Sequence, residues 1–184
     1  MEQQDKLDYE QFLSGDKAGF ERLVLRYKDC LIQFIARYVK DVYQAEDLAQ
    51  DTFVEVFLHP ERFRTDSSFK TYIYTIGHNK AVDYIRKNAK LTLIGEWEET
   101  DAVRADSLLL EEKVIQEEEK RELYRIMKTL KPEYEHILYL IDLEGVSYAD
   151  AAKVLGKSEG QVKILVYRAR KRLKQKMGCS DEER

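Results

Sequence analysis

Residue types that mark several common functional classes are scarce in this chain of 184 residues, which has two cysteines, two prolines, three histidines and eight glycines. Cys30 and Cys179 are far apart, so they form no metal cluster by themselves and are expected to stay reduced. His59, His78 and His136 are equally scattered, without metal-ligand spacing to one another or to a cysteine. There is also no glycine-rich phosphate loop. We therefore expect no metal, no cofactor and no enzymatic activity.

Long apolar runs are missing as well. No stretch approaches the roughly 18 to 20 uncharged apolar residues that cross a bilayer, and the first residues, Met1 to Asp5, are polar and acidic rather than a signal peptide. A cytoplasmic protein is expected. The low proline content, the apolar residues at helical spacing and the small number of alternating patterns predict an all-α fold.

The net charge of −4 conceals a strong segregation of charge. From Glu61 to Lys90 there are seven basic and three acidic residues, and from Ser158 to Met177 there are seven basic and one acidic. Between them, Leu91 to Glu122 holds eleven acidic and four basic residues. Two basic surfaces separated by an acidic connector predict two contacts with a polyanion.

The most informative stretch is residues 147–176, which predicts two helices joined by a short turn. Gly156 is expected to end the first helix in a left-handed conformation, which glycine adopts at little cost. Each helix is expected to start at a serine whose side chain caps it, in a capping box or a close variant: Ser147 with Asp150, and Ser158 with Gln161.

The second of these helices has one apolar side and several basic ones. Val162, Val166, Ala169 and Leu173 recur at steps of four, three and four, so they share a face that must be buried. Such a unit is typical of a helix-turn-helix that lays its second helix against DNA. The alternative is a small helical hairpin with a solvated basic face.

The rest of the chain predicts further helices around these two. An apolar stripe indicates a helix from about Phe20 to Tyr38, and two more are expected near 43–58, with Phe57 inward, and near 68–88, with Ile85 inward. A helix is also possible from Leu108 to Glu119, and Pro132 is expected to open one. The expected division is a first domain over 1–90, an acidic linker over 91–119, a second domain over 120–178 and a tail over 179–184.

Three blocks of sequence carry a resemblance to a known family: residues 45–53, 63–87 and 130–148 with the helix-turn-helix that follows. They resemble regions 2.2, 2.3–2.4 and 4 of the bacterial RNA polymerase sigma-70 superfamily, in its small extracytoplasmic-function (ECF) branch. The resemblance implies two helical domains and a factor that joins core RNA polymerase, recognises a promoter and opens it. It also implies that an anti-sigma factor is a further partner.

The first block is implied to bind polymerase. By resemblance, Asp47, Leu48, Gln50 and Asp51 dock on the clamp helices of the largest subunit, and the flap of the second subunit is a further contact of the chain. An acidic, partly apolar face suits a basic helical partner. The alternative is a solvated acidic stripe beside core residues, and Phe53 is expected to be mainly core.

The second block combines aromatic and basic residues, which suits the capture of unpaired bases and of single-strand phosphates. Asn79, Asp83 and Arg86 fall on one helix face, and by resemblance Asn79 contacts a base of the −10 element. Tyr72 stands where many members carry tryptophan. The alternative is that Phe69, Tyr72 and Tyr74 are core residues. The residues expected at −10 DNA are Arg64, Lys70, Tyr72, Tyr74, Asn79, Lys80, Asp83, Arg86 and Lys87.

In the third block, the start of the last helix is expected to approach base edges of the −35 element, and its later cations to approach phosphates. Ile164 and Leu165 depart from the small polar residue and arginine that many members carry, and neither forms hydrogen bonds to bases. Three roles remain open for them: contact with thymine methyl groups, an extra contact within the domain, or a protein partner. The residues expected at −35 DNA are Ser158, Glu159, Gly160, Gln161, Lys163, Arg168, Arg170 and Lys171.

A different class of protein explains part of the sequence equally well. A transcriptional regulator with a sensory N-terminal domain and the same helix-turn-helix accounts for the third block. It does not account for residues 45–53 or for the aromatic and basic helix that follows. Copurification with core polymerase distinguishes the two hypotheses.

Overall fold

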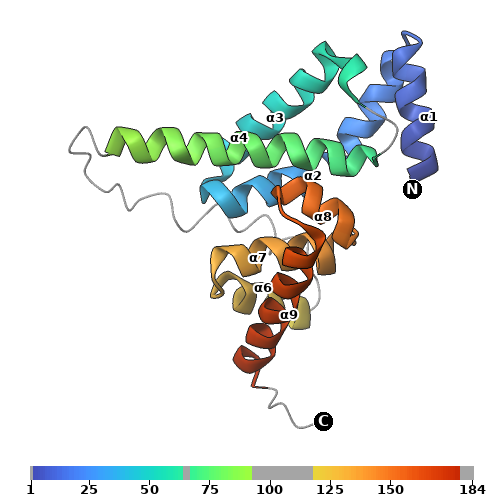
Figure 1. Cartoon of the computed structure of the whole chain (residues 1–184). Helices are drawn as coiled ribbons and strands as arrows, with labels where there is room; N and C mark the ends of the chain where they lie inside the picture. The colour runs from blue at the N-terminus through green and yellow to red at the C-terminus, as the bar shows by residue number, and fades with distance from the viewer. Residues whose placement is uncertain (1, 64–66, 93–117, 179–184) are drawn as a thin grey trace. The chain divides into compact units, whose positions relative to one another are not determined.

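The computed structural model describes residues 2–63, 67–92 and 118–178, and within these ranges it contains eight α-helices and no strand (Figure 1). The chain divides into two compact units, Met1–Asp101 and Ala102–Arg184. The predicted all-α fold of two helical domains is confirmed. Arg64, the possible helix from Leu108 up to residue 117, Cys179 and the expected tail lie outside the described residues. In the described ranges no helix combines the length and the apolar character needed to cross a bilayer.

The first unit is built around a long central helix, α2 (Lys17–Val39), against which α1 (Glu2–Leu13), α3 (Val42–Leu58) and α4 (Phe69–Thr92) all pack. A short 3-10 turn, η1 (Pro60–Arg62), follows α3. Aspartates start two of the helices: Asp16 accepts a hydrogen bond from the Ala18 N–H at 3.0 Å, and Asp41 accepts one from the Gln44 N–H at 3.1 Å. Residues that are fully buried at the centre are Leu23, Leu31, Phe34, Ile35, Val56 and Ile73.

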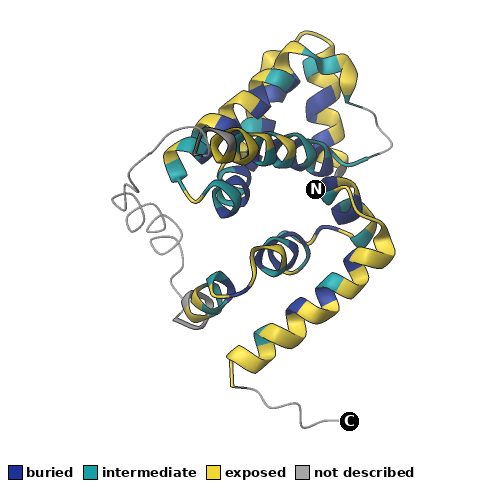
Figure 2. Ribbon diagram, turned by 60° about the vertical axis from the view of Figure 1, so that its left-hand side comes forward, coloured by how far each residue is buried: buried dark blue, intermediate teal, exposed yellow. Residues whose placement is uncertain are grey.

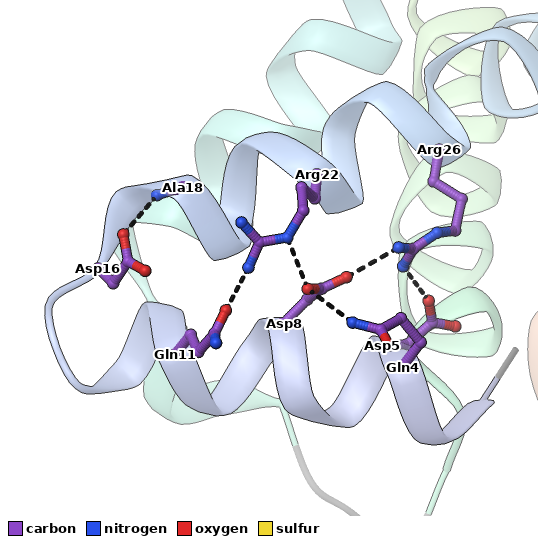
Figure 3. A network of polar contacts seen from close by, with 8 residues as sticks. All are labelled: Gln4, Asp5, Asp8, Gln11, Asp16, Ala18, Arg22 and Arg26. Carbon is purple, nitrogen blue, oxygen red and sulfur yellow. Dashed lines mark hydrogen bonds and ion pairs between the residues drawn. The ribbon is translucent and has the colours of Figure 1, made fainter.

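Helix α1, which apolar periodicity did not predict, is held to α2 by a buried polar network (Figure 3). The fully buried carboxylate of Asp8 accepts hydrogen bonds from Arg22 Nε and Arg26 Nη2, both at 2.8 Å. Asp5 accepts from Arg26 and from the hydroxyl of Tyr27. Burial opposes the ionisation of Asp8, but the hydrogen bonds from the two arginines outweigh it and hold its pKa below the ordinary value.

A second contact ties α1 to the segment between α3 and α4. The Tyr9 hydroxyl donates a hydrogen bond to the Pro60 carbonyl at 2.6 Å. The centroid of its ring lies 4.7 Å from that of Phe63 and 5.6 Å from that of Phe69. Burial raises the pKa of Tyr9, so the phenol stays protonated as a donor. Helix α1 therefore contacts both the turn after α3 and the first residue of α4.

Burial along α3 and α4 corrects two expectations about the core. Phe57 and Ile85, both expected inward, are 39% and 40% exposed. Helix α4 packs against α2 and α3, and its C-terminal end extends past them (Figure 1). Residues 85–89 near that end are exposed. Apolar spacing predicts which side of a helix is apolar, but not where neighbouring helices stop covering it.

The second unit contains α6 (Glu118–Lys128), α7 (Pro132–Leu138), a π-helical turn η3 (Tyr139–Leu143), α8 (Tyr148–Leu155) and α9 (Glu159–Lys176). Pro132 opens α7, as predicted. The π-helical turn, which was not predicted, is closed by a hydrogen bond from the Glu144 N–H to the Tyr139 carbonyl at 2.9 Å. Gly145 follows with a φ of +65°, which turns the chain towards α8.

Candidate nucleic-acid interface

The helix-turn-helix forms as its local sequence predicts. Ser158 Oγ accepts a hydrogen bond from the Gln161 N–H at 3.2 Å, and Gln161 Oε1 accepts one from the Ser158 N–H at 2.9 Å, which completes a capping box. Ser147 caps α8 in a variant of this arrangement, since its hydroxyl accepts from the Asp150 N–H at 3.1 Å and donates to the Asp150 carboxylate at 2.7 Å. Gly156 adopts a φ of +61°.

One side of α9 is buried, and the rest of the helix is largely exposed (Figure 2). Val162, Val166 and Ala169 form the buried stripe, and α9 packs against both α7 and α8. Ala151 of α8 is fully buried, and its small side chain allows a close approach of the helices. The predicted apolar face is confirmed, with Leu173 half-buried at its end.

Some of the cations on α9 are already engaged within the unit. Lys163 lies 2.7 Å from the Glu159 carboxylate, and the hydrogen bond between them raises the pKa of Lys163. Arg170 donates to both carboxylate oxygens of Asp142 in η3, which raises the pKa of Arg170. This arginine, which is expected at a DNA phosphate, links α9 to the π-helical turn in the free chain.

Other cations of α9 remain available. In the described part of the chain, no hydrogen bond or ion pair engages Arg168, Lys171 or Lys174. Lys171 and Lys174 line a cleft of about 500 Å³, to which Tyr148 and Tyr167 contribute aromatic surface. Neither tyrosine is among the residues that the sequence pattern predicts at DNA, although their place on or near a basic helix was a usable signal. The residues lining the cleft are Tyr148, Lys163, Val166, Tyr167, Arg170, Lys171 and Lys174.

The acidic face of α3 is exposed, as a docking surface would be. Asp47, Gln50 and Asp51 are all exposed. Leu48, by contrast, is only 9% exposed and belongs to the core beside Phe53, as its neighbour Ala49 also does. This corrects the expectation for Leu48, because a buried side chain holds the helix in place rather than contacting a partner. We define the docking face as Asp47, Gln50 and Asp51.

On α4, four candidate residues share one side of the helix. Tyr72, Asn79, Asp83 and Arg86 are separated by seven, four and three residues, so they lie along one face. Asn79, Asp83 and Arg86 are exposed, and the latter two form an ion pair at 3.6 Å. Tyr72 is half-buried against Phe63, with ring centroids 5.2 Å apart, and burial raises its pKa. We call these four residues the α4 face.

The remaining candidate residues from the second block differ in exposure and in the partners that they contact. Lys80 lies beside the α4 face and is 2.9 Å from Glu55 of α3, while Lys87 is exposed. Lys70 lies 5.8 Å from the centroid of the Tyr74 ring. Tyr74 itself is 0% exposed, with its ring 4.8 Å from that of Phe34. Its expected contact with DNA is therefore corrected, because a ring enclosed by the core cannot stack on a base.

A helical bundle joined to a helix-turn-helix with a cationic second helix defines a class of DNA-binding transcription proteins. Comparison with known families identifies the branch. The family model for Sigma-70 region 2 matches residues 23–91, and that for Sigma-70, region 4 matches residues 120–173. The ECF RNA polymerase sigma factor SigX of Bacillus subtilis is 32% identical over 167 residues, which cover 89% of this chain and 86% of SigX.

Two further proteins are similar to this chain over most of their length. RNA polymerase sigma-H factor of Pseudomonas aeruginosa is 29% identical over 92% of this chain and 91% of its own. The solved structure of the sigma factor RpoE in complex with the anti-sigma factor NepR from Bartonella quintana is similar at a TM-score of 0.68 and 25% identity, covering 88% of this chain and 98% of RpoE. The chain belongs to the sigma-70 family, as an ECF sigma factor. It acts in transcription initiation together with RNA polymerase.

Proposed function

We propose that this sigma factor divides initiation between its two units. The first unit docks on the clamp helices of the largest polymerase subunit and captures the −10 element. The second unit reads the −35 element and contacts the flap of the second subunit. The observation that carries the proposal is the presence, in one chain, of an exposed acidic face on α3 and of basic surfaces on α4 and α9. The protein works in the cytoplasm, where polymerase is found.

The docking face supports binding to a basic helical partner. Asp47 and Asp51 are one helical turn apart, and both are exposed. Complementary charge across such a contact sets its register and speeds association. Glu55, one further turn along, is instead occupied by Lys80 at 2.9 Å and by Arg62 at 3.6 Å. The polymerase contact is therefore assigned to the middle of α3.

Charge reversal on this face tests the docking role. We expect Asp51→Arg to weaken binding to purified core polymerase about tenfold, because it places like charges opposite each other. Thermal stability should hardly change, since the side chain is exposed. Glu10→Arg, an equal change of charge at an exposed position of α1, is the matched control. Equal affinities for the two variants would reject the docking face.

The α4 face supports the capture of a separated DNA strand at −10. Tyr72 offers an aromatic ring that is only half-buried, and Asn79 offers hydrogen-bonding groups on the same face. Stacking on an aromatic side chain contributes about 1–3 kcal/mol per base. Lys70, Lys80, Arg86 and Lys87 supply positive charge for the phosphates. Tyr72 is therefore assigned to base stacking and Asn79 to base identity.

The second unit supports duplex recognition at −35. Its helix α9 is fixed by a capping box and a buried stripe, so its exposed sides are held at a defined orientation. Residues Ser158 to Gln161 and Lys163 would face base edges, and Arg168 and Lys171 would bind phosphates. An anti-sigma factor is proposed as a further partner, because the similar RpoE of Bartonella quintana was solved with one.

Transcription in vitro tests the proposal as a whole. On a genomic library, purified core polymerase alone should start transcription at random positions or not at all. Once this chain is added, transcription should start at defined sites. The start sites should share two upstream sequence elements. A chain that binds DNA but does not bind core polymerase would instead be a separate helix-turn-helix regulator, and the proposal would be wrong.

A further inference from the structure

The side of α9 opposite the core is not uniformly polar. The buried stripe of α9 is formed by Val162, Val166 and Ala169. A position two residues after any of these is rotated by about 200° around the helix axis and therefore lies opposite the buried stripe. Two large apolar side chains lie there among the cations: Ile164 is 54% exposed and Tyr167 is 68% exposed. We call this side the outer ridge, and it comprises Gly160, Ile164, Tyr167, Arg168 and Lys171.

Gly160 adds a second observation on the same ridge. A β-carbon placed there would meet no atom within 4 Å, so packing does not require a glycine. Its φ is not in the left-handed region either. Glycine nevertheless weakens a helix relative to alanine. The missing side chain leaves open space one turn before Ile164, which suits an object that approaches the helix closely.

The charges around the ridge indicate a polyanion. Arg168 and Lys171 belong to the ridge, and Lys174 follows one turn after Lys171. The acidic residue of α9, Glu159, is neutralised by Lys163 at 2.7 Å. The major groove of B-form DNA admits an α-helix between two rows of phosphates, and the apolar group on its floor is the C5 methyl of thymine. A ridge with an apolar centre and cationic flanks is complementary to such a groove.

We propose that Ile164 recognises the C5 methyl group of a thymine in the −35 element and that Gly160 allows the ridge to approach closely enough for this contact. The inference rests on the proposed placement of α9 in the major groove. It makes Ile164 a specificity residue that selects thymine over cytosine without a hydrogen bond. Arg168 and Lys171 contribute affinity at phosphates but no preference for a base.

Replacement of thymine by deoxyuridine removes the methyl and leaves every hydrogen-bonding group of the base pair unchanged. The holoenzyme, made from full-length chain and purified core polymerase, first selects its −35 sequence from a randomised duplex library. Each thymine of the selected sequence is then replaced in turn. At one position we expect affinity to fall about threefold to fivefold, as for the loss of one buried methyl.

Variants of the chain locate that effect on one side chain. Ile164→Ser should bind thymine and deoxyuridine duplexes equally, and the conservative Ile164→Val should keep part of the difference. Arg168→Gln is the matched control on the same ridge, and it should weaken both duplexes alike while preserving their ratio. Thermal melting of each variant checks that the fold is intact, and Ile164→Val keeps the test informative if the serine variant melts early.

Three results would overturn the inference, each in a recognisable way. Equal affinity for deoxyuridine at every position, with base-pair changes at −35 still harmful, rejects methyl recognition and leaves the proposed function standing. Indifference to every −35 base pair rejects the proposed role of α9 itself. If Ile164→Ser keeps the thymine preference but no longer binds a purified anti-sigma partner, the ridge serves a protein rather than DNA.

Discussion

Two tyrosines on α4 show how position decides the role of a side chain. Tyr72 and Tyr74 are two residues apart, which places them on nearly opposite sides of the helix. Tyr74 is enclosed beside Phe34, whereas Tyr72 keeps part of its ring in contact with solvent beside Phe63. Tyr74 therefore stabilises the bundle, whereas the partly exposed ring of Tyr72 remains accessible for stacking on a base.

The two positions should respond differently to alanine. Tyr74→Ala should lower the free energy of unfolding by about 3–5 kcal/mol, because it leaves a large cavity in the core. Tyr72→Ala should cost about 1 kcal/mol of stability and should strongly reduce opening of the −10 element. Urea unfolding measures the first effect, and permanganate reactivity of −10 thymines in the open complex measures the second. Tyr72→Trp should preserve opening, and failure of the tryptophan variant would reject stacking.

Two glycines, one just before α9 and one in its first turn, should respond with opposite signs. Gly156→Ala should destabilise the second unit by about 1 kcal/mol, because its φ of +61° is strained for alanine. Gly160→Ala should stabilise the helix by about 0.5 kcal/mol and weaken binding to −35 duplexes, because a methyl group fills the open space. Thermal melting and duplex affinity of the holoenzyme distinguish them. Unchanged affinity of Gly160→Ala would reject close approach at this residue.

At the scale of elements, local chemistry made some features predictable. The starts of α8 and α9 follow from Ser147 and Ser158, and the end of α8 follows from Gly156, because capping depends on residues within one turn. Helix α1 was missed because its inward positions include Asp5 and Asp8, which an apolar pattern cannot reveal.

The candidate site was predictable to a similar degree. Composition and spacing located the basic helix and the acidic face of α3. They gave no sign that Arg170 pairs with Asp142, which is 28 residues away in sequence, or that Leu48 lies in the core. Such pairings depend on how elements pack, and for Arg170 also on the π-helical turn that carries Asp142. Sequence pattern therefore predicted the charge of each surface better than the availability of each charge.

The attachment of α1 to α2 should depend on pH through Asp8. Its pKa in the folded protein lies below the ordinary value of 3.8, so its contribution to stability is fully present above pH 3.8 and declines as the pH falls towards the lowered pKa. Asp8→Asn should lower the free energy of unfolding by about 2 kcal/mol at pH 7, the size expected for hydrogen bonds to a charged group. The difference in free energy of unfolding between this variant and the wild type should shrink below pH 3.8.

Urea unfolding at several pH values measures this difference. Glu10→Gln is the matched control, since it removes an exposed carboxylate from the same helix and should change stability by less than about 0.5 kcal/mol. If the difference in free energy of unfolding between Asp8→Asn and the wild type did not depend on pH, packing of the side chain rather than its charge would hold α1 in place.

For the whole molecule, the proposed function requires a chain with a net charge of −4 to bind a polyanion, and the division into two units offers an explanation. The basic excess is concentrated on α4 and α9, one helix in each unit, while the largest acidic excess lies between Leu91 and Glu122. We therefore expect the free chain to bind DNA poorly and each basic surface to act only where polymerase brings it to a promoter. Specific recognition is then expected to require both surfaces together.

Truncation after Asp101, the boundary of the first unit, should separate the roles of the two units. The shortened chain keeps the docking face and the α4 face, so it should bind core polymerase with affinity close to that of the full chain. The affinity of its holoenzyme for DNA should not change with base changes at −35.

The slope of log affinity against log salt should become shallower by about 0.9 for each phosphate that the second unit neutralises in the full-length holoenzyme. Filter binding over a range of salt concentrations measures the slope, with the full-length holoenzyme as the control. An unchanged slope would mean that α9 neutralises no phosphates, whereas failure to bind polymerase would place the main docking surface in the second unit.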